Sequence, residues 1–316
     1  MNGLIAHPYA FDPSYGYDLA RLLAIPPPPE PDDFAPYWTA RHARVSACDP
    51  CPCLSHAGFR GAWRVHDFRY TSADGLSLGG WALTPRNGAV RRVWIVGHGY
   101  GGRDTPDWGW PIGDGAVLFP CFRGMSRSRQ PGLPEDPMRH VLHGIDSRDD
   151  YILGHCVDDL WLAFRAARQL FPDAVWMGYA GISFGGGIGA LAAPWEPLMQ
   201  GVHLNVPSFG HWPLRLGCPT VGSGEAVRAY VHRQGHVPET LAYYDASIAA
   251  SHARAPLLAA LALFDPAVAP PGQFAIHNAW RGEKLLRVLG VGHFDGPGRE
   301  RDEDGVRRAL RRWFVV

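Results

Sequence analysis

A serine stands between two glycines at residues 181–185, which read Gly-Ile-Ser-Phe-Gly. This G-x-S-x-G spacing is typical of a sharp strand-to-helix turn that exposes a serine hydroxyl, and the positions two before and two after the serine must be small. The helix that follows points free amides toward the negative charge that develops in acyl transfer. The pattern therefore indicates that Ser183 is a nucleophile. The alternative is a glycine-rich turn that only lets a helix pack closely on a sheet.

The same glycine-rich stretch continues through residues 187–192, which match the dinucleotide-binding pattern G-x-G-x-x-A. That fingerprint needs an acidic residue about 20 positions further on, at the end of the next strand. The next predicted strand, GVHLNVPS at residues 201–208, has no acidic residue. We therefore expect no dinucleotide-binding site here.

A serine nucleophile needs a base and a group that orients the base. Asp265 and His293 each end a predicted strand, in the stretches LLAALALFD and KLLRVLGVGH. Ligands of open α/β sheets bind at such strand ends, and the chain order serine, acid, histidine is that of the α/β-hydrolase fold. We expect Ser183, Asp265 and His293 to form a catalytic triad. His277, in a predicted helix, and Asp295, which follows the histidine, fit less well. The alternative for Asp265 is an ordinary helix N-cap.

The loop after an earlier predicted strand supplies candidates for an oxyanion hole. Residues 98–102 read His-Gly-Tyr-Gly-Gly and resemble the HGGG-type element of esterases. We expect the backbone amides of Tyr100 and Phe184 to be the donors. Trp108 and Trp110 are candidates for lining the substrate pocket, and ordinary core packing is the alternative for both.

Strands that alternate with helices must position these residues. Apolar runs or helical spacing mark the segments 91–102, 116–124, 147–170, 175–183 and 299–314. This alternation predicts an α/β fold, with a mostly parallel sheet flanked by helices. We expect an N-terminal arm rich in proline and aromatic residues over 1–59, and an α/β-hydrolase domain over 60–316. A small insertion at about 209–250 interrupts the alternation and is expected to lie over the active site.

The overall composition excludes several classes of partner. The chain of 316 residues has 30 Lys plus Arg against 30 Asp plus Glu, so no excess charge indicates nucleic acid or an anionic membrane surface. No apolar run reaches the roughly 18 residues of a membrane span. The first residues lack the basic and apolar pattern of a signal peptide. We expect a cytoplasmic protein that acts on a small molecule.

Three of the six cysteines, Cys48, Cys51 and Cys53, lie within the stretch CDPCPC. A closed zinc site requires four ligands, usually arranged in the sequence as two spaced pairs. His42 and His56 lie nearby, but their spacing matches no standard pattern. Free thiols in a proline-rich turn, and no metal, are the expectation.

Several further motifs resemble one family, that of acetyl xylan esterases and cephalosporin C deacetylases (carbohydrate esterase family 7). They cover nearly the whole chain: DDFAPYW, the Gly-Tyr-x-Gly-Gly loop at 99–102, Asp107-Trp108, Arg123-Gly124, GIDSRDDYILGHCVDDLWLAFRAARQLFP, the serine turn, Asn205-Val206-Pro207, FDPAVAPPGQFAIHNAW and Gly292-His293. The resemblance places the family's catalytic residues on the same serine, aspartate and histidine, and its oxyanion donors on the same two amides. It implies a cofactor-free deacetylase of sugars and small alcohols that assembles as a hexamer, a trimer of dimers.

The sequence departs from the family's pattern at three positions. Met125 follows Arg123-Gly124, Phe184 follows the serine and Phe294 follows the histidine, where the family has glutamine, glutamine and glutamate. We expect Phe184 to keep its backbone donor and to make the pocket wall apolar. Two alternatives to the esterase stay open: an amidase or peptidase on the same triad, and a non-catalytic binding protein on a hydrolase scaffold.

Overall fold

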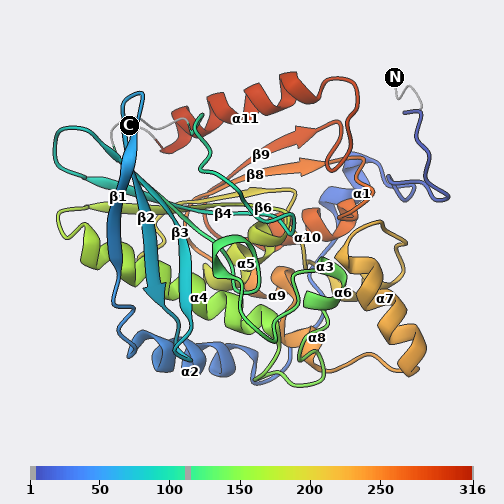
Figure 1. Ribbon diagram of the computed structural model, residues 1–316. Coiled ribbons are helices and arrows are strands. Elements are labelled where there is room, and N and C mark those ends of the chain that lie inside the picture. Colours follow the sequence, from blue (N-terminus) through green and yellow to red (C-terminus); the bar gives the residue numbers. More distant parts are fainter. Residues whose placement is uncertain (1–4, 111–114, 315–316) are drawn as a thin grey trace.

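The computed structural model describes residues 5–110 and 115–314, which form a nine-stranded sheet in the order β1-β2-β3-β5-β4-β6-β7-β8-β9 with helices on both faces (Figure 1). The strands are β1 (Cys53–Arg60), β2 (Trp63–Thr71), β3 (Ser77–Pro85), β4 (Arg92–Gly97), β5 (Ala116–Pro120), β6 (Trp176–Ile182), β7 (Val202–Asn205), β8 (Leu257–Ala262) and β9 (Lys284–Leu289). The helices are α1 (Leu19–Leu23), α2 (Phe34–Ser46), α3 (Pro137–His140), α4 (Ile152–Leu170), α5 (Phe184–Ala192), α6 (Trp212–Leu216), α7 (Ser223–Gln234), α8 (Thr240–Tyr243), α9 (Ala246–Ala250), α10 (Pro270–Ala279) and α11 (Arg299–Phe314).

Most of the sheet is parallel. Strands β5, β4, β6, β7, β8 and β9 run in one direction, and β1, β2 and β3 add an antiparallel extension beside β5. Strands β4, β6 and β8 are almost entirely buried apolar runs, because helices cover both faces of a parallel sheet. The predicted α/β-hydrolase fold is confirmed.

Two hydrophobic clusters hold the layers together. The larger one joins the sheet to α2, α4, α5, α9 and α10 on one face. The smaller one joins the opposite face to α11 through Trp94 and Phe314, whose ring centroids lie 5.2 Å apart. Figure 1 shows α11 alone on its side of the sheet and α4 on the other. The carboxyl ends of the parallel strands are thereby left free for the loops that carry the site.

The N-terminal arm differs from its predicted boundary at residue 59. Residues 53–60 form β1, the edge strand of the sheet, which pairs with β2. The strand escaped sequence analysis because most of its side chains are exposed, so it shows no apolar alternation. Within the arm, α2 packs on the body through Trp38, whose ring lies 5.9 Å from that of Trp161 in α4.

Residues 209–250 lie between β7 and β8 and contain the helices α6, α7, α8 and α9, of which only α7 is longer than five residues. This segment takes the place of a single crossover helix between two parallel strands. In Figure 1, α7 extends outward beside α3 and α6. Across the described ranges, no helix is both long enough and apolar enough to span a membrane.

Candidate active site

Ser183 occupies a sharp turn between β6 and α5. Its backbone has φ 54° and ψ −115°, a conformation that side-chain-bearing residues rarely adopt and that persists only when its surroundings enforce it. The Ser183 amide donates to the Asn205 carbonyl at 2.9 Å, and the Gly185 amide donates to the His98 carbonyl at 3.0 Å. The strained turn is therefore fixed from the neighbouring strands.

The two flanking glycines are required by space. A Cβ atom at residue 181 would lie 2.5 Å from the carbonyl oxygen of Gly185, and one at residue 185 would lie 2.6 Å from that of His98. Both distances are shorter than a Cβ contact allows. The G-x-S-x-G spacing thus has the physical cause that the sequence indicated.

Asp265 and His293 lie just beyond the ends of β8 and β9 and contact each other. The His293 Nδ1 atom lies 2.8 and 3.0 Å from the two carboxylate oxygens of Asp265. Burial works to lower the pKa of His293, but the Asp265 charge and its hydrogen bond outweigh burial and raise the pKa above its usual 6.5. Asp265 is 0% exposed and the His293 side chain is 27% exposed. The pair therefore presents one face of an oriented imidazole to solvent.

Gln273 in α10 positions the aspartate, and sequence analysis missed it. Its Nε2 donates to Asp265 Oδ2 at 3.0 Å and to the Val268 carbonyl at 2.7 Å, while its Oε1 accepts from the Ala262 amide at 3.0 Å. The side chain is fully buried. The Pro270-Pro271 pair that starts α10 was the available signal, because it places a glutamine in the first turn of a helix that follows the strand end.

Ser183 and His293 line the same cavity of about 460 Å³. The other walls come from the loop at Tyr100, from Pro137 and Met138 of α3, and from residues 221–223 and 267–268. In the described ranges no hydrogen bond joins the Ser183 hydroxyl to His293. Catalytic hydrogen bonds are often long in unliganded enzymes and tighten around substrate.

The sequence assigns the oxyanion hole to the amides of Tyr100 and Phe184. Tyr100 lines the cavity, and Phe184 is the first residue of α5, directly after the serine. Neither amide nitrogen donates to another of the described residues. The first amides of a helix have no partner within the helix, so they are free to bind an anion.

His98, at the start of this loop, has a structural role. It is almost fully buried, and its Nε2 accepts from the Phe122 amide at 3.0 Å while its Nδ1 donates to the Gly99 carbonyl at 2.7 Å. Burial lowers the pKa of His98 to about 4. A neutral histidine with both nitrogens engaged cannot act as the base.

Two predictions about the pocket wall are wrong. Trp108 and Trp110 pack against the smaller hydrophobic cluster, and neither lines the cavity of Ser183. The Trp110 ring lies 5.7 Å from that of Trp94, a fully buried member of this cluster. Phe184 is 0% exposed, its ring stacks on that of Tyr100, and it is not among the residues that line the cavity. The sequence pattern could not show in which direction these three side chains point, because tertiary packing sets their orientation.

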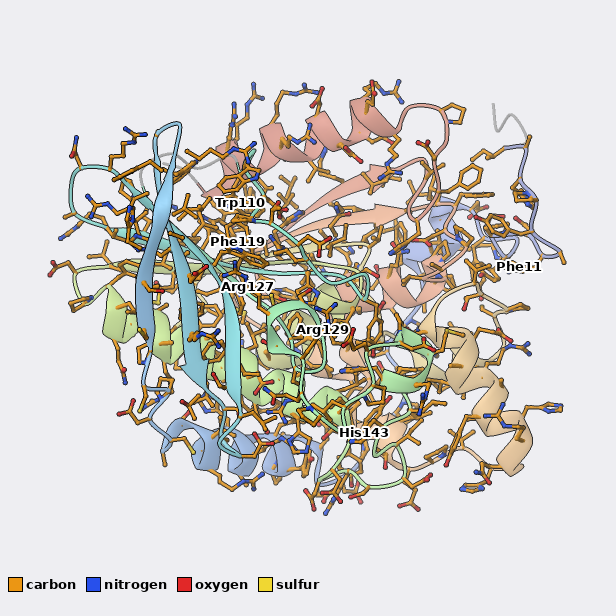
Figure 2. The ribbon with its side chains drawn as sticks, in the orientation of Figure 1. Phe11, Trp110, Phe119, Arg127, Arg129 and His143 are labelled. Atoms are coloured by element: carbon orange, nitrogen blue, oxygen red, sulfur yellow. The ribbon has the colours of Figure 1, made fainter. Side chains whose placement is uncertain are left out.

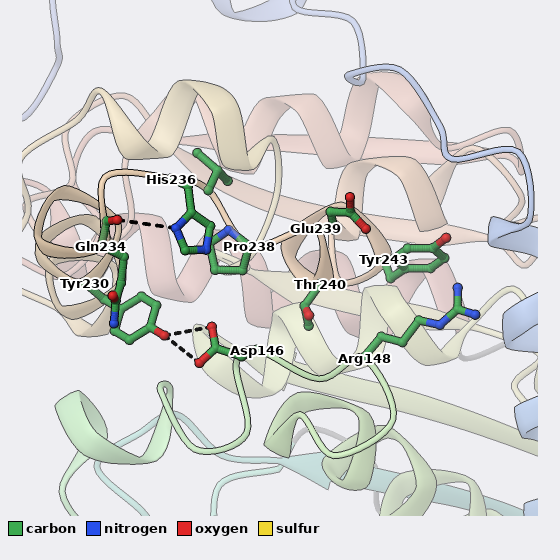
Figure 3. A pocket seen from close by; sticks show the side chains of 10 residues that line it. Asp146, Arg148, Tyr230, Gln234, His236, Pro238, Glu239, Thr240 and Tyr243 are labelled. Atoms are coloured by element: carbon green, nitrogen blue, oxygen red, sulfur yellow. Dashed lines mark hydrogen bonds between the residues drawn. The ribbon is translucent and has the colours of Figure 1, made fainter.

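A larger hollow, of about 680 Å³, lies at the other end of α7 (Figure 3). Two of its polar side chains pair with each other, since the Tyr230 hydroxyl lies 2.7 and 2.6 Å from the carboxylate oxygens of Asp146. It holds His236 but no serine or cysteine beside it. The hollow therefore lacks the serine and the oriented histidine that line the smaller cavity.

Over the residues that the structure describes, no cluster of three or more potential ligands could hold a metal ion. Cys48, Cys51 and Cys53 are free thiols, with the last two exposed.

The sheet order, the strained serine turn after β6 and the buried acid–histidine pair define a serine hydrolase of the α/β-hydrolase class. The family model for acetyl xylan esterase (AXE1) matches residues 25–302, and the chain belongs to this family. It is therefore a serine carboxylic ester hydrolase.

Solved structures share the fold at low sequence identity. An acetyl xylan esterase from Paenibacillus sp. R4 aligns over 93% of this chain and 99% of its own, with TM-score 0.82 and 23% identity. Acetyl xylan esterase 1 from Thermoanaerobacterium sp. JW/SL YS485 aligns over 95% of this chain and 99% of its own, with TM-score 0.79 and 21% identity. The acylaminoacyl peptidase of Pyrococcus horikoshii aligns over 80% of this chain but 41% of its own, with TM-score 0.61 and 17% identity. A search of curated proteins gave no match.

Proposed function

We propose that Ser183, Asp265 and His293 are the catalytic triad of a deacetylase for acetylated sugars, with the amides of Tyr100 and Phe184 as the oxyanion hole. One observation carries this proposal. A serine on a strained turn and a histidine held by a buried aspartate line the same cavity. The choice of an acetyl group and of a sugar as the alcohol rests on the match to the acetyl xylan esterase family.

The proposed reaction begins with attack of the Ser183 hydroxyl on the ester carbonyl. His293 takes the hydroxyl proton, and Asp265 fixes the imidazole tautomer and stabilises the cation. The two amides bind the negative oxygen of the tetrahedral intermediate, where one donor is typically worth about 2.7–4 kcal/mol. His293 then gives its proton to the leaving alcohol and activates a water that hydrolyses the acyl-enzyme.

The cavity supports a small acyl group. Ile182, Val221 and Val268 are apolar residues around the serine, whereas Ser208 and Ser223 add hydroxyls to the same lining. Apolar side chains beside the nucleophile suit a methyl group, and hydroxyls suit the alcohol half of a sugar ester.

The test is hydrolysis of p-nitrophenyl esters with acyl chains of two to eight carbons, beside the corresponding acetanilide, by wild type and Ser183→Ala. We expect Ser183-dependent activity that is greatest on acetate. Greatest activity on longer chains would remove the acetyl assignment. Faster cleavage of the anilide than of the ester would favour the amidase. Equal background rates in both proteins would contradict an enzyme at this site.

We further propose a homo-oligomer, which the family resemblance favours. Light scattering coupled to size exclusion gives the mass of the assembly directly. A mass of 34.7 kDa, that of one chain, would contradict the proposal.

A further inference from the structure

Residues 5–12 have no helix or strand and residues 13–16 form a turn, and we call residues 5–17 together the N-terminal strap. From Ile5 to Phe11 its side chains alternate between partly buried and exposed, so His7, Tyr9 and Phe11 share one face. Their rings follow one another with centroids 5.6 and 5.7 Å apart, and Tyr15 continues the row 5.9 Å from Phe11. Figure 2 shows Phe11 on this outlying segment.

The row of rings covers the chain neighbours of the proposed acid and base. Phe264 precedes Asp265 and Phe294 follows His293, and their rings lie 5.2 Å apart. His7 lies 5.4 Å from Phe264, and Tyr9 lies 6.1 Å from Phe294. Phe264 is almost fully buried as a result. Aromatic contacts of this kind stabilise beyond the area they bury, so the strap binds the ends of two adjacent strands to each other.

The strap also holds the aspartate through its backbone. The Asp265 amide donates to the Pro13 carbonyl at 3.1 Å. The Tyr15 hydroxyl donates to the Pro219 carbonyl at 2.6 Å, which fixes the strap to the segment between β7 and β8. Asp12 stabilises the intervening turn by accepting from the amides of Ser14 and Gly16. The strap is thus fixed on both sides of the Asp265 turn.

No residue of the strap lines the cavity of Ser183, and all of it precedes residue 25, where the family match begins. We propose that the strap is a positioning element of this chain, which holds Asp265 and His293 in register for proton transfer without touching substrate. The proposal rests on the proposed function, because it assigns the strap to the same acid–histidine pair.

The test compares deletion of residues 1–17 with four further proteins: Tyr9→Ala, Tyr9→Phe, Ala10→Ser and a deletion of residues 1–4 only. Asp18 stays as the N-cap of α1 in both deletions. Measured quantities are kcat, KM, the pH profile of kcat/KM and the melting temperature. A displacement of the pair by an ångström is enough to reduce the rate by one to two orders of magnitude, so we expect kcat to fall at least about tenfold in the long deletion.

KM should stay within about twofold, because the strap does not contact the cavity. The acidic limb of the profile should move to lower pH, since a displaced Asp265 no longer raises the pKa of His293. Tyr9→Ala should show the same changes to a smaller extent. Tyr9→Phe, Ala10→Ser and the short deletion should match wild type.

A purely structural strap would lower the melting temperature and the active fraction without moving the pH profile, and that result would overturn the proposal. So would an unchanged kcat in folded protein. If the long deletion does not fold, Tyr9→Ala against Tyr9→Phe decides between the same outcomes. Failure of the proposed function is a separate result, because wild type itself would then lack Ser183-dependent hydrolysis.

Discussion

The rings of Tyr100 and Phe184 stack with their centroids 4.1 Å apart. The amides of these two residues are the proposed oxyanion donors, so a side-chain contact fixes the separation of two backbone donors. Phe122 and His140 pack edge-on against the Phe184 ring at 5.0 and 5.9 Å. Donors held in place before the reaction need no reorganisation when charge develops. The stacked rings therefore hold the two proposed oxyanion donors in place.

Phe184→Leu should leave the preference for acyl chain length unchanged, because the ring does not line the cavity. It should destabilise the fold by about 1–3 kcal/mol, the range for a disrupted core contact, as measured by urea unfolding. The matched control is Ile182→Ala, at a cavity residue that is 44% exposed, which should change the chain-length profile with little effect on stability. If Phe184→Leu alone changed the preference for acyl chain length, the Phe184 ring would have to contribute to the cavity wall.

Gln273→Met should reduce kcat by about tenfold or more, because the Asp265 carboxylate loses a donor that fixes its rotation. The variant also leaves the Ala262 amide and the Val268 carbonyl without their partner, at about 1–3 kcal/mol for each unsatisfied group. Gln234→Met, at an exposed residue of α7, is the control and should behave as wild type in both assays. Steady-state kinetics on p-nitrophenyl acetate and urea unfolding separate the two effects.

The pH profile of kcat/KM should rise from the acid side with a midpoint above 6.5. The base must be unprotonated to accept the Ser183 proton, and Asp265 raises the pKa of His293, so activity is lost at a higher pH than for a free histidine. Asp265→Asn removes this charge, so the midpoint should move to lower pH. Its kcat should also fall by about 10⁴, because the wrong imidazole tautomer becomes available.

Asp295→Asn serves as the control for that experiment, since this carboxylate is exposed and lies outside the cavity. It should keep the wild-type midpoint and kcat. A wild-type midpoint in Asp265→Asn would show that another group governs the acidic limb.

The parts of the site that the sequence could predict are those set by local geometry. Gly181 and Gly185 identify the serine turn, because backbone atoms of the turn itself and of the adjacent end of β4 leave no room for a side chain there. Asp265 and His293 could be predicted because each lies at the end of a predicted strand, and because serine, acid and histidine come in that order along the chain.

The remaining parts depend on tertiary packing. Gln273 reaches Asp265 only because α10 returns across the end of β8. The inward direction of Phe184 and the position of Trp110 are set by aromatic neighbours distant in sequence. The edge strand β1 forms because β2 offers it a partner, and its own residues show little apolar pattern.

The buried ion pair between Arg123 and Asp159 makes a further prediction about stability. Arg123 Nε and Nη2 both lie 2.6 Å from the Asp159 carboxylate, and its Nη1 lies 2.9 Å from Asp74. Burial raises the pKa of Asp159 to about 6 even though the Arg123 charge opposes that rise. Arg123 also holds the site indirectly, because its carbonyl lies 3.1 Å from Nε2 of His140, whose Nδ1 contacts the Tyr100 hydroxyl.

Arg123→Met should therefore destabilise the fold by about 3–5 kcal/mol, because it leaves a carboxylate buried without its partner. The loss should be larger at pH 8 than at pH 5. Without Arg123 the pKa of Asp159 rises further above its unfolded value, so the unfolded state binds fewer protons than the folded state and stability falls as pH rises. The double variant Arg123→Met/Asp159→Leu removes the charge and should recover part of the loss. Urea unfolding of the four proteins of this cycle measures the coupling, and additive losses would contradict a direct pair.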